Sequence, residues 1–233
     1  MMRKLYEKNL LTFALILVGV YVVGMSVLDS LPVAFAGALG AAGGSVFFYF
    51  WLKHHKLLAE NGLQRGNFPL LWYIPLAVLT LGNLWNGIAW PEDGVGTVLF
   101  VVKMLGVGFL EELIFRSFLY RAMAKDSVKW AVIVSSLTFG VGHIVNLLNG
   151  SNMALTENLV QIICAAAMGF AYVMVFLRSG SLWPCILSHG VFNSLSLLER
   201  PGQPAAELVV RGAICLVALG YGIALSKKET PGA

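Results

Sequence analysis

Long apolar segments alternate with short polar turns along the whole chain. Eight of these segments are close to the length of about 20 mainly apolar residues that a helix needs to cross a bilayer. Turn residues separate them, for example at Asp29-Ser30 and Ser179-Gly180. The pattern predicts an all-α fold, a polytopic membrane helical bundle with about eight transmembrane helices. The expected spans are Leu10 to Leu28, Leu31 to Leu52, Pro69 to Trp90, Val95 to Tyr120, Val128 to Leu148, Asn158 to Leu177, Leu182 to Leu198 and Ala205 to Leu225.

The composition excludes most soluble classes of protein. Hydrophobic residues make up 58% of the 233 residues and charged residues 12%, whereas about 25% of a soluble domain is charged. The mean hydropathy is +0.78. A chain folded in water keeps a surface that polar groups must cover, and this chain has too few of them. We therefore expect a single integral membrane domain over residues 1–233, not a soluble enzyme, a disordered chain or a secreted disulfide scaffold.

The basic residues predict the orientation of the spans. If the N-terminus is inside, the outer loops hold Arg200 alone, while Lys103, Arg116 and Arg211 lie within spans. The inner segments then hold the other twelve, which are Arg3, Lys4, Lys8, Lys53, Lys56, Arg65, Arg121, Lys125, Lys129, Arg178, Lys227 and Lys228. Because Lys and Arg concentrate in cytoplasmic loops, we expect both termini in the cytoplasm and a multi-pass protein of the cell (inner or plasma) membrane. The charges form no continuous patch, so no nucleic-acid partner is expected, and Lys103 and Arg211 are expected to snorkel toward the outer interface.

Three cysteines, Cys164, Cys185 and Cys215, lie in apolar runs. Their number is odd, and no two of them have the spacing of a CxxC motif. We therefore expect them to be small packing residues and not a disulfide framework.

Ionisable and amide side chains within the spans are the candidates for chemistry, because a charge at that depth is costly unless it is paired or borders water. Three spans carry a concentrated set, namely Glu111, Glu112 and Arg116 in the fourth, His143 in the fifth, and His189 and Asn193 in the seventh. At about 1.5 Å per residue, four of these residues lie roughly 12–20 Å from the cytoplasmic ends of their spans. They are Glu111, His143, His189 and Asn193. Three helices of alternating direction can therefore bring them to a similar depth.

The spacing of these residues sorts them by helix face. Glu112 and Arg116 are four residues apart and are expected to form an ion pair on one face. Glu111 is rotated by about 100° from Glu112 and can point into the bundle. His189 and Asn193 also share a face. Three glycines lie beside the histidines, namely Gly140, Gly142 and Gly190. They leave room for a neighbouring backbone or a substrate chain.

The chemistry of this set fits hydrolysis. A carboxylate such as Glu111 can take a proton from water, a histidine can hold that water, and imidazole and amide N–H groups can stabilise an oxyanion. Glu111, His143 and His189 could instead bind Zn²⁺, with water completing the site. The sequence contains no HExxH or GxSxG motif and no pair of Asp residues on separate spans.

The same residues form three motifs, in order and on separate spans. They are EExxxR at Glu111, Glu112 and Arg116, FxxxH at Phe139 and His143, and HxxxN at His189 and Asn193. Each motif is weak alone. The ordered triple inside a polytopic chain resembles the CAAX protease and bacteriocin-processing (CPBP) family, the type II CAAX prenyl endopeptidase-like or abortive-infection intramembrane proteases. The resemblance covers about residues 100–194, and it places a family-like catalytic core over about residues 95–200.

The resemblance implies a conical intramembrane active-site cavity open toward the cytoplasmic side. It implies that Glu111 and His143 activate a water molecule and that His189 and Asn193 stabilise the oxyanion. Supporting roles are implied for Glu112, Arg116 and Phe139. A Zn²⁺ ion on Glu111, His143 and His189 and metal-independent activation of water both agree with the motifs. The partners expected are membrane lipid and a membrane-associated protein or peptide substrate, while the substrate's identity and the oligomeric state do not follow from the sequence.

Three functions are compatible with these motifs. An intramembrane endopeptidase, the reading we favour, requires that replacing Glu111 or His143 abolishes function without loss of protein. A non-catalytic membrane adaptor, or a bacteriocin-immunity or regulatory protein, would keep the motif as a structural network and would still function as Glu111→Gln. A proton-coupled carrier would usually show repeats or broken helices in matching halves, and neither is evident in the sequence.

Overall fold

The computed structural model describes the chain except for residues 1, 34, 149–153 and 228–233. The long helices are α2 (Leu10–Ser30), α3 (Ala36–His54), α5 (Gly94–Glu112), α7 (Val128–Gly142), α9 (Leu155–Ser179), α10 (Trp183–Leu195) and α11 (Pro204–Ser226). The shorter ones are α1 (Met2–Lys8), α4 (Ile74–Thr80), α6 (Tyr120–Ala124), α8 (Val145–Leu148), the 3₁₀ turns η1 (Leu70–Tyr73), η2 (Gly82–Leu84) and η4 (Ser196–Leu198), and the π-helix η3 (Leu113–Leu119). Within these described residues the strand-like pairing is limited to an isolated bridge between Ile88 and Glu199. The all-α prediction is confirmed.

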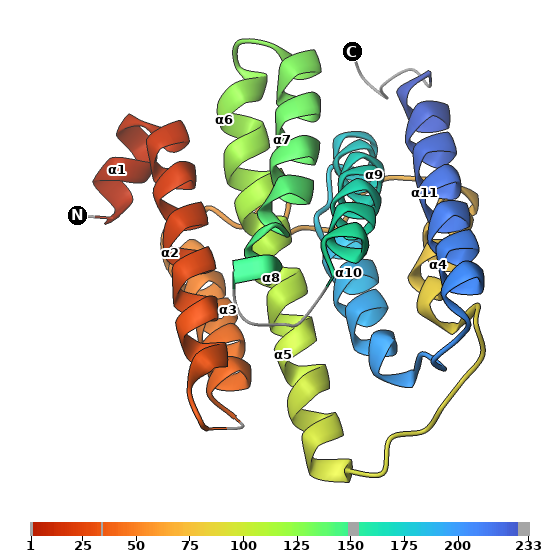
Figure 1. Ribbon diagram of the computed structural model, residues 1–233. Helices are drawn as coiled ribbons and strands as arrows, with labels where there is room; N and C mark the ends of the chain where they lie inside the picture. Colours follow the sequence, from red (N-terminus) through yellow and green to blue (C-terminus); the bar gives the residue numbers. More distant parts are fainter. Residues whose placement is uncertain (1, 34, 149–153, 228–233) are drawn as a thin grey trace.

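Helix α5 lies at the centre of the bundle (Figure 1). Helices α3 and α10 pack against it, and η3 and α6 continue it toward the turn into α7. Helix α9 packs against both α7 and α11, while α2 packs on α3 and η3. The segment that carries the EExxxR motif is thus in contact with elements from both halves of the chain.

The bundle has two distinct ends (Figure 1). Helix α1, the α6–α7 turn, the α9–α10 turn and the C-terminal end of α11 lie at one end, which we call the basic end because most of the Lys and Arg residues are there. The loops that follow α2, η2 and η4 lie at the other end, which we call the far end. The side of a membrane that each end faces stays a prediction.

Four helices are long and apolar enough to cross a membrane, by length and composition. They are Leu10–Ser30, Val128–Leu147, Leu155–Ser179 and Ala205–Ser226, which correspond to the first, fifth, sixth and eighth expected spans. The chain therefore has the apolar helices of a membrane protein, while the count of eight spans stays a prediction.

The third expected span, Pro69 to Trp90, is not one continuous helix. It is divided into η1, the seven-residue α4 and η2. Gly82 and Gly87 follow α4, and glycine is the weakest helix former after proline. Gly87 has a φ of +101°, a backbone conformation that glycine adopts without strain. Apolar composition alone did not reveal this break.

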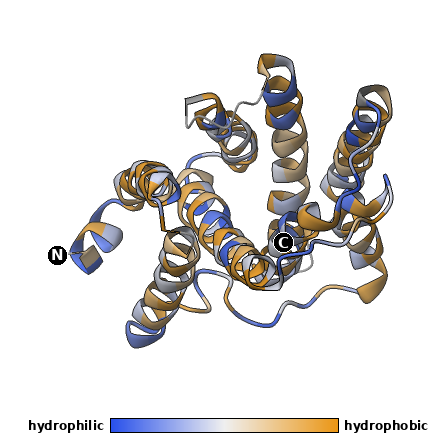
Figure 2. Cartoon of the chain, turned by 60° about the horizontal axis from the view of Figure 1, so that its bottom comes forward, coloured by the Kyte–Doolittle hydropathy of each residue, from blue (hydrophilic) through white to orange (hydrophobic). Residues whose placement is uncertain are grey.

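Large apolar side chains cover the outside of the bundle. Val20, Leu39 and Leu216 are 62%, 63% and 72% exposed. Figure 2 shows apolar residues along the lengths of the long helices. Exposed apolar area on this scale is unfavourable in water and favourable against lipid, so the outer surface fits a bilayer.

Glycines set the close approach of the helices that carry the site. A Cβ on Gly108 of α5 would lie 2.7 Å from the backbone nitrogen of Gly190 on α10. A Cβ on Gly140 of α7 would lie 2.7 Å from the carbonyl oxygen of Ile162 on α9. The prediction that glycines beside the histidines admit a neighbouring backbone is confirmed for Gly140 and Gly190. Gly142 has no neighbour within 4 Å of such a Cβ and lines the cavity described below.

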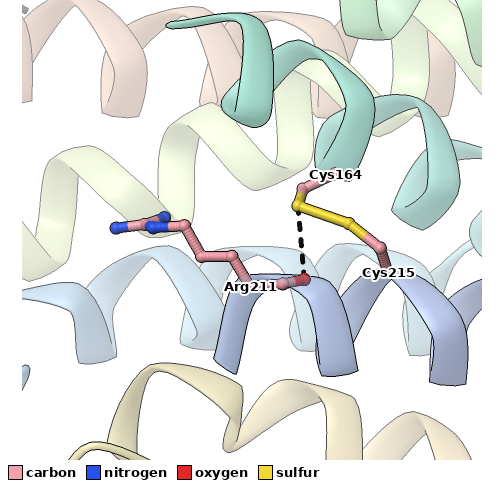
Figure 3. Close-up of a disulfide and its surroundings, with 3 residues drawn as sticks. All are labelled: Cys164, Arg211 and Cys215. Carbon is pink, nitrogen blue, oxygen red and sulfur yellow. Dashed lines mark hydrogen bonds between the residues drawn. A yellow bond between two sulfur atoms is a disulfide. The ribbon is translucent and has the colours of Figure 1, made fainter. Parts of the chain in front are cut away.

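One prediction about the cysteines is wrong. Cys164 on α9 and Cys215 on α11 are joined by a disulfide, and the sulfur of Cys164 lies 3.4 Å from the carbonyl oxygen of Arg211 (Figure 3). The two residues are 51 apart in the sequence, so only the packing of α9 on α11 reveals the pair. Cys185 is buried and free, as expected of a packing residue.

Candidate active site

A cavity of about 960 Å³ enters the bundle among α2, α5, α7, α9, α10 and α11. Its walls include all four side chains that the sequence proposes for catalysis, namely Glu111, His143, His189 and Asn193. Phe139 also lines it. The structure therefore brings residues from three separate motifs to one cavity.

The EExxxR motif lies where α5 changes into a π-helix. Glu111 and Glu112 are the last two residues of α5, and Arg116 lies in η3. In the wider π-turn the Phe115 carbonyl accepts from the backbone N–H of Tyr120, five residues later, and also from the hydroxyl of Ser135 on α7 at 2.8 Å. Such segments occur often at functional sites, because they redirect side chains on an otherwise regular helix. Here the two adjacent carboxylates have different environments.

Glu112 points into the protein and is fully buried. Its Oε1 lies 3.2 Å from Nη1 of Arg116, so the predicted ion pair is confirmed. The same oxygen lies 2.8 Å from Nδ1 of His189. Because a carboxylate accepts hydrogen bonds, Nδ1 of His189 is the donor when Glu112 is ionised. Glu112 therefore fixes the orientation of the His189 ring, a contact that the motif spacing did not reveal.

Glu111 points into the cavity, and its side chain is 15% exposed. The hydroxyl of Tyr21 on α2 donates to Oε1 of Glu111 at 2.7 Å. The other oxygen, Oε2, lies 3.6 Å from Nε2 of His189. Glu111 thus has partners from two other helices. The sequence analysis missed Tyr21, because a single tyrosine in an apolar span 90 residues from its partner carries no spacing signal.

His143 is the C-cap residue of α7 and lines the cavity. Its Nδ1 lies 3.1 Å from the carbonyl oxygen of Phe139, one helical turn earlier. A carbonyl only accepts, so Nδ1 is the donor in this bond, and Nε2 of a neutral His143 carries a lone pair. The backbone carbonyl of His143 in turn accepts from the Asn158 side chain at 2.9 Å. These two bonds hold the imidazole at the end of α7.

Aromatic rings pack around the two histidines. The Phe139 ring meets the rings of His143 and His189 edge to face, at centroid distances of 5.4 and 5.5 Å. The guanidinium carbon of Arg116 lies 4.0 Å from the Phe139 centroid, which adds a cation–π contact to its ion pair. Tyr172 of α9 stacks on His189 at 5.7 Å. Phe139 is therefore in contact with three motif residues. Tyr172 also contacts a motif residue, His189, but does not itself belong to any of the three motifs.

Asn193 lies one turn after His189 on α10, and both side chains line the cavity, as their spacing predicts. Asn83 of η2 also lines the cavity, and its amide donates to the Phe192 carbonyl at 2.7 Å. This bond ties η2 to the turn of α10 that carries Asn193. The amide of Asn193 is thus placed on a helix that is held from both sides, by α5 and by η2.

The cavity extends from Glu111 toward the far end of the bundle. There it is lined by two cross-helix ion pairs, Lys103 with Asp29 at 2.6 Å and Arg211 with Glu199 at 3.9 Å. We call these four residues the mouth. Lys103 and Arg211 were expected to snorkel; both side chains are partly exposed, and each is also paired with a carboxylate. Since the mouth is at the far end, cytoplasmic basic loops and a cavity open toward the cytoplasm cannot both hold in this fold.

The three residues proposed as zinc ligands do not form a metal-binding group as placed. Among the residues that the structure describes, no three His, Cys, Asp or Glu side chains are arranged to hold a metal ion. Nδ1 of His189 contacts Glu112 and Nδ1 of His143 contacts a backbone carbonyl. We therefore derive no catalytic step through a metal.

Comparison with known proteins confirms the resemblance read from the motifs. Residues 93–195 match the family described as type II CAAX prenyl endopeptidase Rce1-like, a range that contains all three motifs. The chain is also 24% identical over 104 residues to the "Putative membrane peptidase YdiL" of Bacillus subtilis (strain 168). That alignment covers 44% of this chain and 37% of the relative, so the chain spans little more than a third of the relative's length. No solved structure matches the chain. One match is to a family of endopeptidases, and the other is to a protein named as a putative membrane peptidase.

Proposed function

We propose that this chain is an intramembrane endopeptidase that hydrolyses peptide bonds of a membrane-associated protein or peptide. The observation that carries the proposal is the single cavity lined by Glu111, His143, His189 and Asn193. A second, buried carboxylate, Glu112, holds one of the two imidazoles. Purely structural hydrogen bonding would not require another carboxylate, Glu111, whose partly exposed side chain lines the cavity beside that imidazole. The match to a family of endopeptidases agrees with this chemistry.

The attacking water is activated by Glu111 and His143 in this proposal. Tyr21 occupies Oε1 of Glu111, which leaves Oε2 to take a proton from water. His143 donates from Nδ1 to the backbone, which leaves Nε2 to accept a hydrogen bond from the same water. Two acceptors then hold the two hydrogens of the water, and its oxygen lone pair faces the scissile carbonyl. The carboxylic acid formed on Glu111 later returns the proton to the leaving amine.

The oxyanion is stabilised by His189 and Asn193. An imidazole that carries protons on both nitrogens donates Nδ1–H to Glu112 and Nε2–H into the cavity. The Asn193 amide supplies a second N–H from the next turn of α10. Oε1 of Glu112 lies 2.8 Å from Nδ1 of His189, and Nη1 of Arg116 lies 3.2 Å from the same oxygen. Glu112 and Arg116 are thus positioning residues for His189, not groups that touch the substrate.

A cleavage assay on purified protein in detergent tests the proposal. Wild type, Glu111→Gln and His143→Ala are compared on a quenched fluorescent peptide library. Glu7→Gln serves as the matched control, because Glu7 is an exposed carboxylate on α1 that pairs with Arg3 outside the cavity. We expect cleavage by wild type and Glu7→Gln, and a loss of at least about a hundredfold in Glu111→Gln, since removal of a general base commonly costs about 10²–10⁴.

Two outcomes would redirect the proposal. Full biological activity of Glu111→Gln in cells would replace the protease with a non-catalytic adaptor, because the amide still accepts the Tyr21 hydrogen bond. Loss of wild-type cleavage with a chelator, restored by Zn²⁺, would replace the metal-independent route with a metal-dependent one. Retained cleavage with the chelator would support activation by the Glu111 and His143 side chains alone.

A further inference from the structure

The cavity is built from one half of the bundle. Its lining residues come mainly from the C-terminal half of α2, from α5 between Phe100 and Glu111, from α9 between Thr156 and Tyr172 and from the first turns of α11. The C-terminal ends of α7 and α10 complete it. In the alternating bundle most of these segments lie toward the far end (Figure 1).

Exposure increases along the cavity toward that same end. His189 and Glu111, at its inner end, have side chains that are 6% and 15% exposed. At the mouth, the side chain of Lys103 is 24% exposed and that of Asp29 is 42% exposed. Lys103 lies eight residues before Glu111 on the same helix, or about 12 Å along its axis. The route to the outside therefore runs from Glu111 past Lys103 to the far end.

The basic residues lie at the opposite end. The inner segments predicted from the sequence contain twelve Lys and Arg residues, and the loops of the far end contain Arg200 alone. Positive residues are retained in the cytoplasm during insertion, so this asymmetry assigns the far end to the non-cytoplasmic side. The argument depends on the loops and is independent of the active-site residues.

The disulfide gives a second, independent indication. Cys164 lines the cavity in the far-end half of α9, and its disulfide joins it to Cys215 at the middle of α11 (Figure 3). Disulfides form and persist on the oxidising side of the membrane and are rare where thiol reductants keep cysteines reduced. A cavity open to the non-cytoplasmic side gives this pair access to oxidant.

We propose that the cavity opens to the non-cytoplasmic side and that its substrates are extended, mainly apolar peptide segments of exported or secreted chains. The substrate class rests on the proposed protease function, whereas the orientation does not. The cavity wall between mouth and site is largely apolar, with Met25, Phe100, Met104, Phe192 and Ile214 among its residues. The mouth presents one cation and one anion on each side, so it favours neither a strongly acidic nor a strongly basic segment.

Cysteine labelling tests the orientation without any need for activity. Ser196→Cys is placed where the cavity lining is exposed at the far end, and Asp126→Cys is placed in the α6–α7 turn at the basic end. Val107→Cys lines the cavity one turn before Glu111. The three variants are treated with a membrane-impermeant maleimide in sealed right-side-out and sealed inverted membrane vesicles, and the unsubstituted chain gives the background.

We expect Ser196→Cys and Val107→Cys to be labelled in right-side-out vesicles as fully as after lysis, and Asp126→Cys to be labelled only in inverted ones. The reverse pattern, or labelling of any variant equally in both vesicle types, would overturn the orientation. Labelling of Ser196→Cys without Val107→Cys would overturn the continuous path from the mouth to Glu111.

The same vesicles separate the substrate inference from the protease proposal. A quenched library of apolar peptides is added outside, with Glu111→Gln as the inactive reference. Cleavage that depends on Glu111 and occurs only in right-side-out vesicles supports the inference. Cleavage only in inverted vesicles overturns the inference and leaves the protease intact. Absence of cleavage in both, with activity also absent in detergent, overturns the protease and leaves the orientation to the labelling result.

Discussion

Two ion pairs on one continuous helical stretch lie in opposite surroundings. The stretch runs from Gly94 through η3 to Ala124, and Lys103 and Arg116 lie on it. Lys103 pairs with Asp29 at 2.6 Å, and both side chains are partly exposed at the cavity mouth. Arg116 pairs with Glu112 at the longer distance of 3.2 Å, and neither side chain is exposed at all. The shorter contact is the one that water can replace.

The difference shows that burial, and not distance, decides what such a pair contributes. When an exposed pair is broken, both charges return to water, and the net change is about 0.2–1 kcal/mol. When one partner of a buried pair is removed, the other charge stays in a medium of low dielectric, which costs about 3–5 kcal/mol. The Glu112–Arg116 pair should therefore be needed for folding. The Lys103–Asp29 pair should contribute little to stability and should affect only the charge at the mouth.

The two pairs also differ in what else they contact. Oε1 of Glu112 holds Nδ1 of His189, and Arg116 covers the ring of Phe139. The buried pair is thus part of the site's architecture. The Lys103–Asp29 pair connects α5 to α2, which is also the helix that carries Tyr21. Each pair can be tested separately because they share no partner.

The largest effect is expected at the buried pair. Glu112→Gln keeps an oxygen for His189 but leaves Arg116 without its counter-charge, and Arg116→Met leaves Glu112 unpaired. Each single substitution should lower the free energy of unfolding by about 3–5 kcal/mol. The loss should appear as a lower midpoint temperature of thermal aggregation in detergent. The double variant should recover part of this loss, because no unpaired charge is left. Single variants as stable as wild type would show that water reaches the pair.

The second effect concerns the crossing of α5 and α10, which brings Glu112 to His189. Gly108→Ala places a Cβ 2.7 Å from the Gly190 nitrogen, so the two backbones must separate. Overpacking of this kind costs about 1–3 kcal/mol, and the displaced His189 should lose more activity than stability. Gly43→Ala is the matched control, because its Cβ would meet nothing within 4 Å. It should be neutral or stabilising by up to about 1 kcal/mol. Equal behaviour of the two variants would contradict the close-approach argument.

Much of the site could be predicted from the sequence because its chemistry is carried by periodic spacing. The i to i+4 spacing of Glu112 and Arg116 predicted their pair, and that of His189 and Asn193 predicted a shared face. The depth of each residue along its span followed from the helical rise. The contacts of Tyr21 and Tyr172 could not be predicted, because they depend on which helices become neighbours.

The fold was predicted in kind but not in detail. Hydropathy identifies apolar segments, and it therefore predicted helices over most of the chain. It does not reveal the π-helix after Glu112 or the break after α4, because both depend on backbone hydrogen bonds formed in the folded bundle. The pairing of Cys164 with Cys215 is likewise a property of the α9–α11 contact and has no local sequence signal.

The third prediction concerns the tyrosine that reaches the catalytic carboxylate. Tyr21→Phe removes the hydrogen bond to Oε1 of Glu111 and leaves the ring in place. We expect kcat/KM to fall by about tenfold, equivalent to about 1.4 kcal/mol, with unchanged protein levels. Tyr49→Phe on α3 is the control for loss of a hydroxyl elsewhere. An unchanged kcat/KM would make Tyr21 a packing residue only.

The smallest effect is expected at the mouth, where it also sharpens the contrast between the two pairs. Lys103→Gln, Asp29→Asn and the double variant form a thermodynamic cycle, and its coupling energy should be below about 1 kcal/mol. Salt should reduce this coupling further, since charges that water reaches are screened at a Debye length of about 8 Å in physiological salt. The corresponding cycle for Glu112 and Arg116 should be several times larger and nearly independent of salt, because ions do not enter a pair with no exposed surface. A salt-sensitive coupling at Glu112–Arg116 would mean that the cavity reaches behind the His189 ring, and the two pairs would then differ in degree and not in kind.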